Sequence, residues 1–407
     1  MKFDMLTYKP KYLLLFGIVG WILAISVPLI GLERDYYTGM EKNEISFVWT
    51  FFPIILMTSA ILSIKGLYQF LIGRAVSLEV VAFFIILVTS VVLGRLSSSA
   101  YAALGIFLML IFMAFWSMDS ALRKNCFKMI SVITIGVFYI AILVHGLPQE
   151  RWIGGIHPNI AGTLLTAGAI AAFLGWQRKC LPLVVLAIIG TILVSSRYSI
   201  MAIFIILTIV GYVKIANSWQ ARTAIALGGI TIITLLFFGD SFDFINKTLQ
   251  ISDRNRGITS GFTGRSDLWA NFRPQFIEAP LFGYGFRNRE DYLTTHNAYM
   301  NLILENGILI SGFLLIFITF KLVNGLFVMK KMSWEGCCVT SGLFALMMSL
   351  FFQPQLINFG DTVGVMFLIL LAAPSPRHFI EQVATEPRQA QSIRMTASRF
   401  VSSAGRR

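Results

Sequence analysis

One histidine stands where a long hydrophilic segment returns to apolar sequence. The stretch TTHNAYMNLILENG, residues 294–307, begins with two threonines and His296 and continues as an apolar run. We expect a helix to begin here, capped by Thr294 or Thr295, with His296 in its first turn. The positive end of the helix dipole disfavours a charged imidazolium at that position. A neutral imidazole at a membrane–water boundary can act as a general base, although an interfacial histidine that only forms hydrogen bonds fits the position equally well.

Arginines are the second group of residues that could do chemistry. Arg254, Arg256 and Arg265 lie in the same hydrophilic segment, and Arg197 lies in the tight turn SSRYS between two apolar stretches. A guanidinium presents a planar fork that matches phosphate oxygens. These side chains are therefore candidates to bind a phosphorylated ligand. The simpler interpretation is that they contact lipid phosphates or, for Arg197, that the side chain extends to the membrane interface.

A polar stripe follows the histidine. Asn297, Asn301 and Glu305 are four residues apart, so they share one face of the expected helix. Glu305 lies nine residues after His296, which is ~13 Å along a helix axis and too far for a local partner. An ionisable group inside an apolar run is a functional candidate. We favour a positioning role, in which the stripe packs into the helix bundle, over a catalytic one.

The sequence shows no pattern for a metal or a nucleotide. The four histidines and four cysteines lack metal-ligand spacing, and neither a Walker loop nor a Gly-x-Ser-x-Gly motif occurs. Two outward acidic pairs, Asp240/Asp243 and Glu290/Asp291, are more typical of solvated loops than of a cation site. We therefore expect neither a metal nor another cofactor.

The elements that must position these residues are apolar. The chain is 56% hydrophobic and only 13% charged, a composition that indicates an all-α polytopic membrane protein. About twelve apolar stretches approach the length that crosses a bilayer. They are residues 12–31, 45–64, 76–94, 99–116, 127–146, 159–175, 181–196, 198–215, 222–239, 298–320, 336–353 and 357–373.

Basic residues give the expected orientation. With the N-terminus placed in the cytoplasm, the short inner loops carry more lysine and arginine than the short outer loops, and the arginine-rich C-terminal tail also lies inside. All four cysteines fall at inner ends, so no disulfide is expected. The net charge of +13 is scattered over loops on both faces, which argues against a nucleic-acid partner. We predict a bacterial inner-membrane protein with both termini cytoplasmic.

These signals divide the chain into four parts. Residues 1–239 hold nine transmembrane helices, 240–297 form a long periplasmic loop, 298–373 hold three more helices, and 374–407 form a disordered tail. Within the loop, SDLWANFRPQFIEA predicts a short amphipathic helix at the membrane surface. Leu268, Trp269, Phe272 and Phe276 would share its apolar face, Ser266 would cap it, and Pro274 would bend or break it. The following APLFGYGF is typical of a turn.

Four motifs together resemble a known family. SSRYS, TGRSDLWANF, PLFGYGF and HNAYMNLILENG occur in the order seen in the O-antigen ligase and Wzy-type polysaccharide polymerase family. The resemblance covers residues 190–312, and the first half of the chain matches only as a run of membrane helices. It implies a GT-C-like fold and a glycosyltransferase that acts in lipopolysaccharide or exopolysaccharide biosynthesis. The implied donor is a glycan on undecaprenyl diphosphate, used in the periplasm without a nucleotide sugar or a metal.

The resemblance also implies residue roles. His296 would be the base that activates the acceptor hydroxyl, and Arg197 and Arg265 would hold the donor diphosphate. Arg254 and Arg256 align less closely with that role. Asn297, Asn301, Glu305 and Trp269 would support the site.

Three functions stay open at this point. A polymerase would transfer the glycan to the next lipid-linked repeat, with a chain-length regulator as a possible partner, whereas an O-antigen ligase would transfer it to the lipid A core. Gly307 is followed by Ile308, Leu309 and Ile310, a departure from the ligase pattern that favours the polymerase, although Gly312 could still serve close helix packing. A polysaccharide transporter or flippase is the alternative of another class. Transporters concentrate charge near the bilayer midplane, whereas here the charge gathers in one outer loop.

Overall fold

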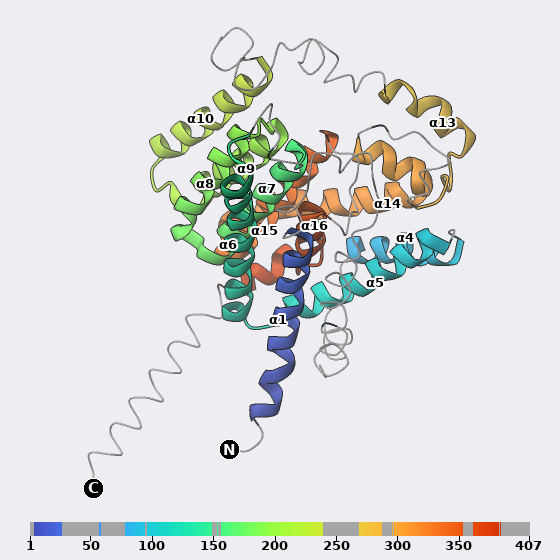
Figure 1. The fold of residues 1–407 in the computed structure, drawn as a ribbon, viewed down its shortest axis with the longest axis horizontal. Helices are drawn as coiled ribbons and strands as arrows, with labels where there is room; N and C mark the ends of the chain where they lie inside the picture. The colour runs from blue at the N-terminus through green and yellow to red at the C-terminus, as the bar shows by residue number, and fades with distance from the viewer. Residues whose placement is uncertain are drawn as a thin grey trace.

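The structure is a computed structural model built entirely from helices in the part of the chain that it describes. That part comprises residues 4–26, 57, 78–93, 96–148, 153, 156–238, 268–286, 295, 297–352, 361–381 and 383. Figure 1 shows the arrangement of the helices. Their bounds are α1 Asp4–Ser26, α4 Leu78–Leu93, α5 Leu96–Trp116, α6 Ser120–His145, α7 Pro158–Trp176, α8 Leu181–Leu193, α9 Arg197–Val210, α10 Trp219–Phe238, α13 Phe272–Glu278, α14 Ala298–Val328, α15 Trp334–Ser349 and α16 Thr362–Leu371.

The apolar stretches predicted from the sequence coincide with these helices. Every predicted stretch except 45–64, which apart from Met57 lies outside the described residues, overlaps one of them. Within the described residues, four helical segments are long and apolar enough to cross a membrane: Ser120–His145, Pro158–Leu193, Arg197–Ile215 and Ala298–Lys331. The chain is therefore a helical membrane protein, and the total of twelve crossings stays a prediction.

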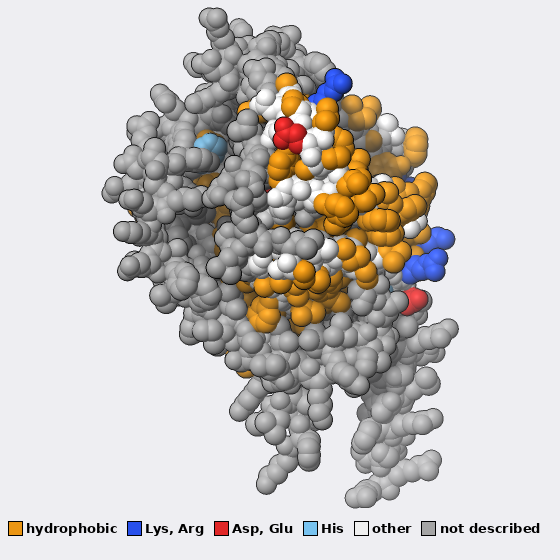
Figure 2. Space-filling view, turned by 90° about the vertical axis from the view of Figure 1, so that its right-hand side faces the viewer, with side chains coloured by type: hydrophobic (Ala, Val, Ile, Leu, Met, Phe, Trp, Pro, Cys, Tyr) orange, Lys and Arg blue, Asp and Glu red, His pale blue; other side chains and the backbone are white. Residues whose placement is uncertain are grey.

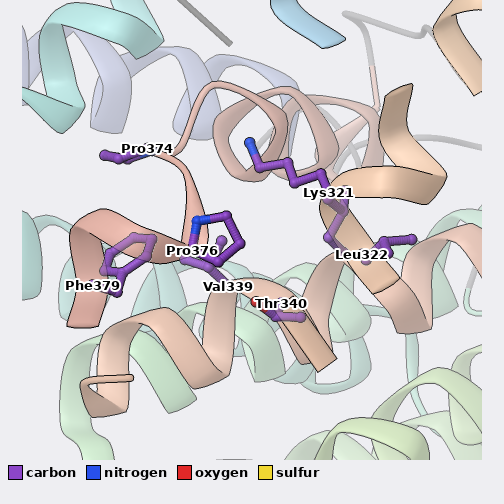
Figure 3. Close-up of a pocket in the computed structure, with 8 residues that line it drawn as sticks. Lys321, Leu322, Val339, Thr340, Pro374, Pro376 and Phe379 are labelled. Carbon is purple, nitrogen blue, oxygen red and sulfur yellow. The ribbon is translucent and has the colours of Figure 1, made fainter. Parts of the chain in front are cut away.

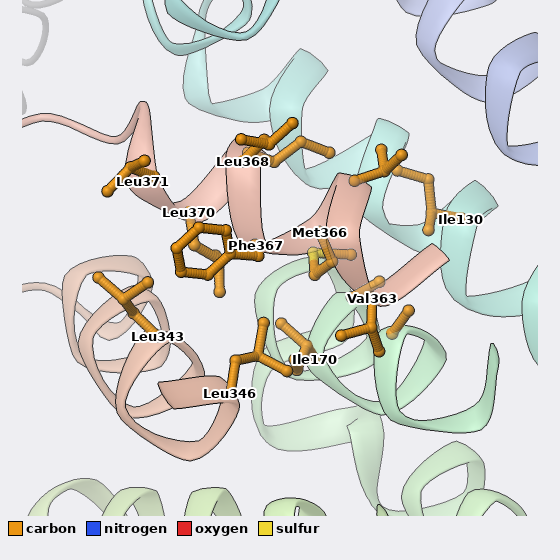
Figure 4. Close-up of a cluster of buried hydrophobic side chains, with 14 of the residues drawn as sticks. Ile130, Ile170, Leu343, Leu346, Val363, Met366, Phe367, Leu368, Leu370 and Leu371 are labelled. Atoms are coloured by element: carbon orange, nitrogen blue, oxygen red, sulfur yellow. The ribbon is translucent and has the colours of Figure 1, made fainter. Parts of the chain in front are cut away.

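The core of the bundle surrounds α16. All ten residues of this helix are buried, as expected for a helix that is apolar on every side. Figure 4 shows Met366 and Phe367 among Ile130 of α6, Ile170 of α7 and Leu346 of α15. Around this centre α6 packs along α7, and α15 packs along α9, while α4 lies between α5 and α14 in the part of the molecule seen at the right of Figure 1.

A buried ion pair joins two helices where the chain reverses between α5 and α6. Arg123 near the start of α6 donates to Glu335 of α15 through Nε at 3.0 Å and Nη2 at 2.8 Å. Its other nitrogen, Nη1, donates to the carbonyls of Trp116 and Met118. The guanidinium also lies 5.3 Å from the centre of the Trp116 ring. Arg123 thus holds the start of α15 against the α5–α6 turn.

Glu335→Ala should destabilise the protein strongly, because it leaves the Arg123 charge buried without its carboxylate. We expect a loss of about 3–5 kcal/mol in the free energy of unfolding, measured by thermal unfolding in detergent. The double variant Arg123→Met/Glu335→Leu removes both charges and should recover most of that loss. If the single variant and the double variant melt at the same temperature, the pair is not the source of the stabilisation.

A second buried pair corrects the predicted place of a lysine. A predicted stretch that ends at residue 320 places Lys321 in the inner loop that follows, but Lys321 lies inside α14, where its Nζ is 2.8 Å from Glu79 Oε1 of α4. The same ammonium donates to the carbonyls of Leu371 and Ala373, each at 2.8 Å. Helix α14 extends beyond the predicted end at residue 320 because this pairing makes a buried charge tolerable. Figure 3 shows the small pocket beside Lys321, whose other walls are mainly apolar.

The C-terminal boundary of the bundle also differs from the prediction. The tail was expected to be disordered from Pro374, whereas residues 376–381 are helical. Phe379 is buried, packs edge-on against Trp116 and accepts a hydrogen bond through its carbonyl from Ser333 N. One aromatic side chain in the core is enough to order the segment that carries it, so the ordered part of the chain reaches at least Glu381.

Candidate functional site

The SSRYS turn places Arg197 as the first residue of α9. Ser195 has a positive φ of 50°, which reverses the chain after α8. The backbone N–H groups of Ser195 and Ser196 donate to carbonyls of α8, at Ile192 and Thr191. Ser196 and Ser199 are buried, with their hydroxyl oxygens 3.0 Å apart. Arg197 is half-buried and lies in a turn that hydrogen bonds hold on both sides, to α8 before it and between Ser196 and Ser199 around it.

The start of α7 provides the surface on which this turn rests. Tyr198 donates its hydroxyl hydrogen to the carbonyl of Asn159. A β-carbon built on Gly162 would lie 2.2 Å from Ser196 Oγ and 2.4 Å from Ser199 Oγ, so only glycine allows this approach. His157 caps α7 and its Nδ1 accepts a hydrogen bond from Asn159 N. His157 thus has a structural role at the start of α7.

Gly162→Leu should displace the SSRYS turn without touching any ligand. If the chain has the glycosyltransferase activity that the resemblance implies, we expect the rate of glycan transfer to fall roughly tenfold or more. The reason is that a small misplacement of a binding group has a large effect on rate. The measurement is product formation by protein whose size-exclusion profile is unchanged. Gly136→Leu in α6 is the matched control, because no atom lies within 4 Å of a β-carbon at that position. Equal activity of both variants would show that the turn does not matter.

The start of α14 differs from the prediction in its cap. Asn297, not Thr294 or Thr295, is the N-cap, and its side chain accepts hydrogen bonds from the N–H groups of Tyr299 and Met300. Asparagine is a preferred N-cap residue, which the sequence could have indicated. His296 therefore directly precedes the cap instead of lying in the first turn, and its own placement lies outside the described residues.

The residues on either side of His296 are held by the first turns of α14. Thr295 is fully buried, and both its N–H, at 2.9 Å, and its hydroxyl, at 2.8 Å, donate to Asn301 Oδ1. The N–H of Asn301 donates in turn to the carbonyl of Asn297. Asn297, Asn301 and Glu305 are all buried. Thr295, which the sequence suggested only as a helix cap, is instead a supporting residue, because its side chain and N–H bind a side chain six positions later.

Helix α14 is sharply bent at Gly307, whose φ of 70° and ψ of 168° are not helical. The hydroxyl of Ser311 donates to the carbonyl of Leu302 at 2.7 Å, although nine residues of straight helix would separate these positions by about 13 Å. The expected single span 298–320 is thus two arms, 298–306 and 308–328. Glu305 lies on the short first arm and not within the longer one.

The loop helix is interrupted, as Pro274 predicts. The helical turn at 268–270 ends at Asn271, and α13 starts afresh at Phe272 with Pro274 in its first turn, where the missing N–H has no helical partner to lose. Ser266, the expected cap, lies outside the described residues. Phe272 and Phe276 stack with ring centres 5.5 Å apart, as their shared face predicts, and Trp269 is half-buried.

The turn after α13 fits into the bend of α14. The N–H groups of Tyr284 and Gly285 donate to the carbonyls of Leu304, at 2.7 Å, and Glu305, at 2.9 Å. A β-carbon on Gly283, which has φ 68°, would lie 2.4 Å from the carbonyl oxygen of Leu304. The N–H of Ile308 donates to the carbonyl of Pro280 at 2.9 Å. The two motifs PLFGYGF and ENG are therefore parts of one structural unit.

Tyr284 closes this unit on the side of α13. Its hydroxyl oxygen lies 2.8 Å from Glu278 Oε2 and 2.9 Å from the carbonyl oxygen of Gln275. Burial and the hydrogen bond to the Glu278 carboxylate raise the pKa of Tyr284 to about 12. The phenol is therefore protonated at neutral pH and can donate to the carboxylate.

The described contacts bring several helix ends together. Asn159 at the start of α7 meets Tyr198 at the start of α9. Tyr299 at the start of α14 meets the end of α15, where it donates to the Met347 carbonyl and lies against the Phe351 ring at 4.7 Å. Helix α15 packs along α9, and Lys214, just after α9, donates to the carbonyl of Met332, just before α15. The two helices are therefore antiparallel, and Arg197 at the start of α9 lies at the same end of the bundle as the residues around His296. Arg254, Arg256 and Arg265 lie outside the described residues.

These features define a helical membrane protein with rigid helix starts gathered at one end of the bundle. Residues 182–317 match the family model Wzy_C, described as O-antigen ligase, so this region is similar to that family. It includes the SSRYS turn, α13 and the bend of α14. The family implies a glycosyltransferase-type activity of the ligase or polymerase kind. No curated protein matches the chain.

Proposed function

We propose that this protein is a polysaccharide polymerase of the bacterial inner membrane. It would transfer a glycan from undecaprenyl diphosphate to a hydroxyl of the next lipid-linked repeat, on the periplasmic side. The observation that best supports the proposal is that two motifs of the region that matches the family, SSRYS and the HN motif at the start of α14, are both held in place by buried hydrogen bonds. Arg197 opens α9 from a buried turn, and His296 stands between Thr295 and Asn297, both of which are fixed to α14.

The chemistry requires two kinds of group, and the chain offers both. His296 would remove the proton of the acceptor hydroxyl as that oxygen attacks the anomeric carbon of the donor. The bond from this carbon to the diphosphate oxygen breaks, and undecaprenyl diphosphate leaves with the electron pair. Arg197 and Arg265, with Arg254 and Arg256, would stabilise the phosphates as the charge moves onto them. Attack opposite the leaving group inverts the anomeric centre, and no metal takes part.

The second candidate is an O-antigen ligase, the function named in the description of the matching family. Its acceptor would be the lipid A core instead of a second lipid-linked repeat. A chain-length regulator is expected as a partner only for the polymerase. The two functions share the donor and the base, so His296 and the arginines have the same roles in both.

Reconstitution separates these functions. Purified protein in lipid vesicles receives a lipid-linked repeat, either alone or together with lipid A core. A polymerase forms a ladder of longer lipid-linked chains with the donor alone, and a ligase forms product only when the core is present. Movement of the repeat across the membrane without a new glycosidic bond would overturn both proposals in favour of a transporter.

Arg197→Ala and Arg265→Ala should each weaken donor binding. A hydrogen bond to a charged group contributes about 1.5–3 kcal/mol, so we expect the Kd for the lipid-linked donor to rise roughly 10- to 100-fold. The measurement is donor binding to protein in nanodiscs. Arg178→Ala, which removes an exposed arginine just after α7, is the control and should leave the Kd unchanged. Unaltered donor affinity in both site variants would remove the diphosphate role.

A further inference from the structure

The second arm of α14 has one continuous apolar face. Leu309, Phe313, Ile316, Phe320, Val323 and Phe327 are exposed and follow each other at alternating intervals of four and three residues, which places them on one side of the helix. The arm comprises residues 308–328 and is about 31 Å long, close to the hydrocarbon thickness of a bilayer. An arm of this length that crosses the bilayer begins, at Ile308, near one boundary of the hydrocarbon.

The turn after α13 is fixed to that boundary. Pro280 accepts the hydrogen bond of Ile308 N, and a β-carbon on Gly307 would lie 1.9 Å from the carbonyl oxygen of Leu281. Such close backbone contact leaves no room for the turn to move away from the start of the arm. The turn and α13 therefore sit at the level where the arm begins.

Three large apolar side chains of this segment are exposed. Their exposed fractions are 64% for Ile277, 50% for Leu281 and 66% for Phe282. We call these three side chains the loop patch. Exposed Ile308 and Leu309 continue it onto the arm. Figure 2 shows hydrophobic side chains over much of the described part of the face seen from the right of Figure 1, with a few charged side chains among them.

A positively charged side chain lies beside the loop patch. Arg273 is exposed and lies one helical turn before Ile277, so both side chains project from the same side of α13. An apolar side chain and an arginine on one side of a short helix are typical of a segment in the interface, where the guanidinium meets lipid phosphate. We take phospholipid as the occupant because the patch continues the exposed apolar face of an arm long enough to cross a bilayer.

We infer that α13 and the 279–286 turn form a membrane-binding surface, with the loop patch inserted among phospholipid acyl chains and Arg273 at the headgroups. The surface would hold the loop motifs against the bilayer whether or not the chain transfers glycans. It would act through lipid contact and needs no partner protein.

Spin labels test this directly in the full-length protein. All four native cysteines are buried, so Ile277→Cys and Phe282→Cys can be labelled selectively and placed in phospholipid nanodiscs. Collision of the label with oxygen, which is enriched in lipid, is compared with collision with a water-soluble nickel chelate. Phe320→Cys, on the arm, gives the lipid reference, and Lys179→Cys, exposed just after α7, gives the aqueous reference.

The expected result is that labels at 277 and 282 resemble the label at 320. Labels at both positions that resemble the one at 179 would overturn the inference, because the surface would then face water and not acyl chains. Leu281→Cys replaces either variant that fails to elute as a single folded species. The readout does not depend on glycan transfer, so its failure and the failure of the proposed function are distinguishable.

Discussion

His296→Ala should reach the membrane and fold as the unaltered protein does, yet lose glycan transfer by about 10²- to 10⁴-fold, the usual contribution of a general base. The physical reason is that the acceptor hydroxyl would keep its proton during attack. Donor binding, which we assign to the arginines, should stay within a factor of two or three. The measurements are product formation and donor Kd on the same preparation.

A histidine elsewhere supplies the control. His145 lies in the last turn of α6, and His145→Ala should transfer glycan at the normal rate. A nearly normal rate of glycan transfer by the His296 variant would show that His296 is not the general base. Loss of both transfer and thermal stability would instead point to a structural histidine, because a base contributes to the rate and not to the fold.

Gly307→Ala should be among the most destabilising single substitutions in the chain. An L-residue at φ 70° is strained by roughly 1–2 kcal/mol, and the added β-carbon would lie 1.9 Å from the carbonyl oxygen of Leu281. The 279–286 turn must then separate from the bend of α14, with loss of the hydrogen bonds that join them. We expect a fall of at least about 2 kcal/mol in the free energy of unfolding, measured by thermal unfolding in detergent.

Gly312→Ala is the matched control within the same arm. Among the described residues, no atom outside the neighbouring helix backbone lies within 4 Å of a β-carbon at Gly312, so the close helix packing that the sequence left open has no described partner there. Alanine should there stabilise the helix by about 0.5–1 kcal/mol, because it has less conformational freedom to lose on folding. Two variants with the same melting temperature would show that the bend at Gly307 is not a structural requirement.

Part of this protein could be predicted from its sequence because the signals are local. Runs of apolar residues mark helices with little dependence on their neighbours, and α4 to α10, α15 and α16 lie where hydropathy placed them. The pairing of Phe272 with Phe276 and the turn at APLFGYGF follow from the same kind of short-range pattern. The residue types of His296 and Arg197 and their positions beside apolar runs indicated the candidate chemistry in the same way.

Tertiary contacts decided the rest. The bend at Gly307 appears only when the turn from residues 279–286 occupies the space that a straight helix would fill. Lys321 leaves its expected loop because Glu79, far away in the sequence, offers it a buried partner. Thr295 supports the site through Asn301, and Gly162 does so through Ser196 and Ser199. Sequence alone determined which segments are apolar and which side chains could react, whereas packing between distant segments decided where the chain bends and what holds the reactive residues, since those contacts exist only in the folded bundle.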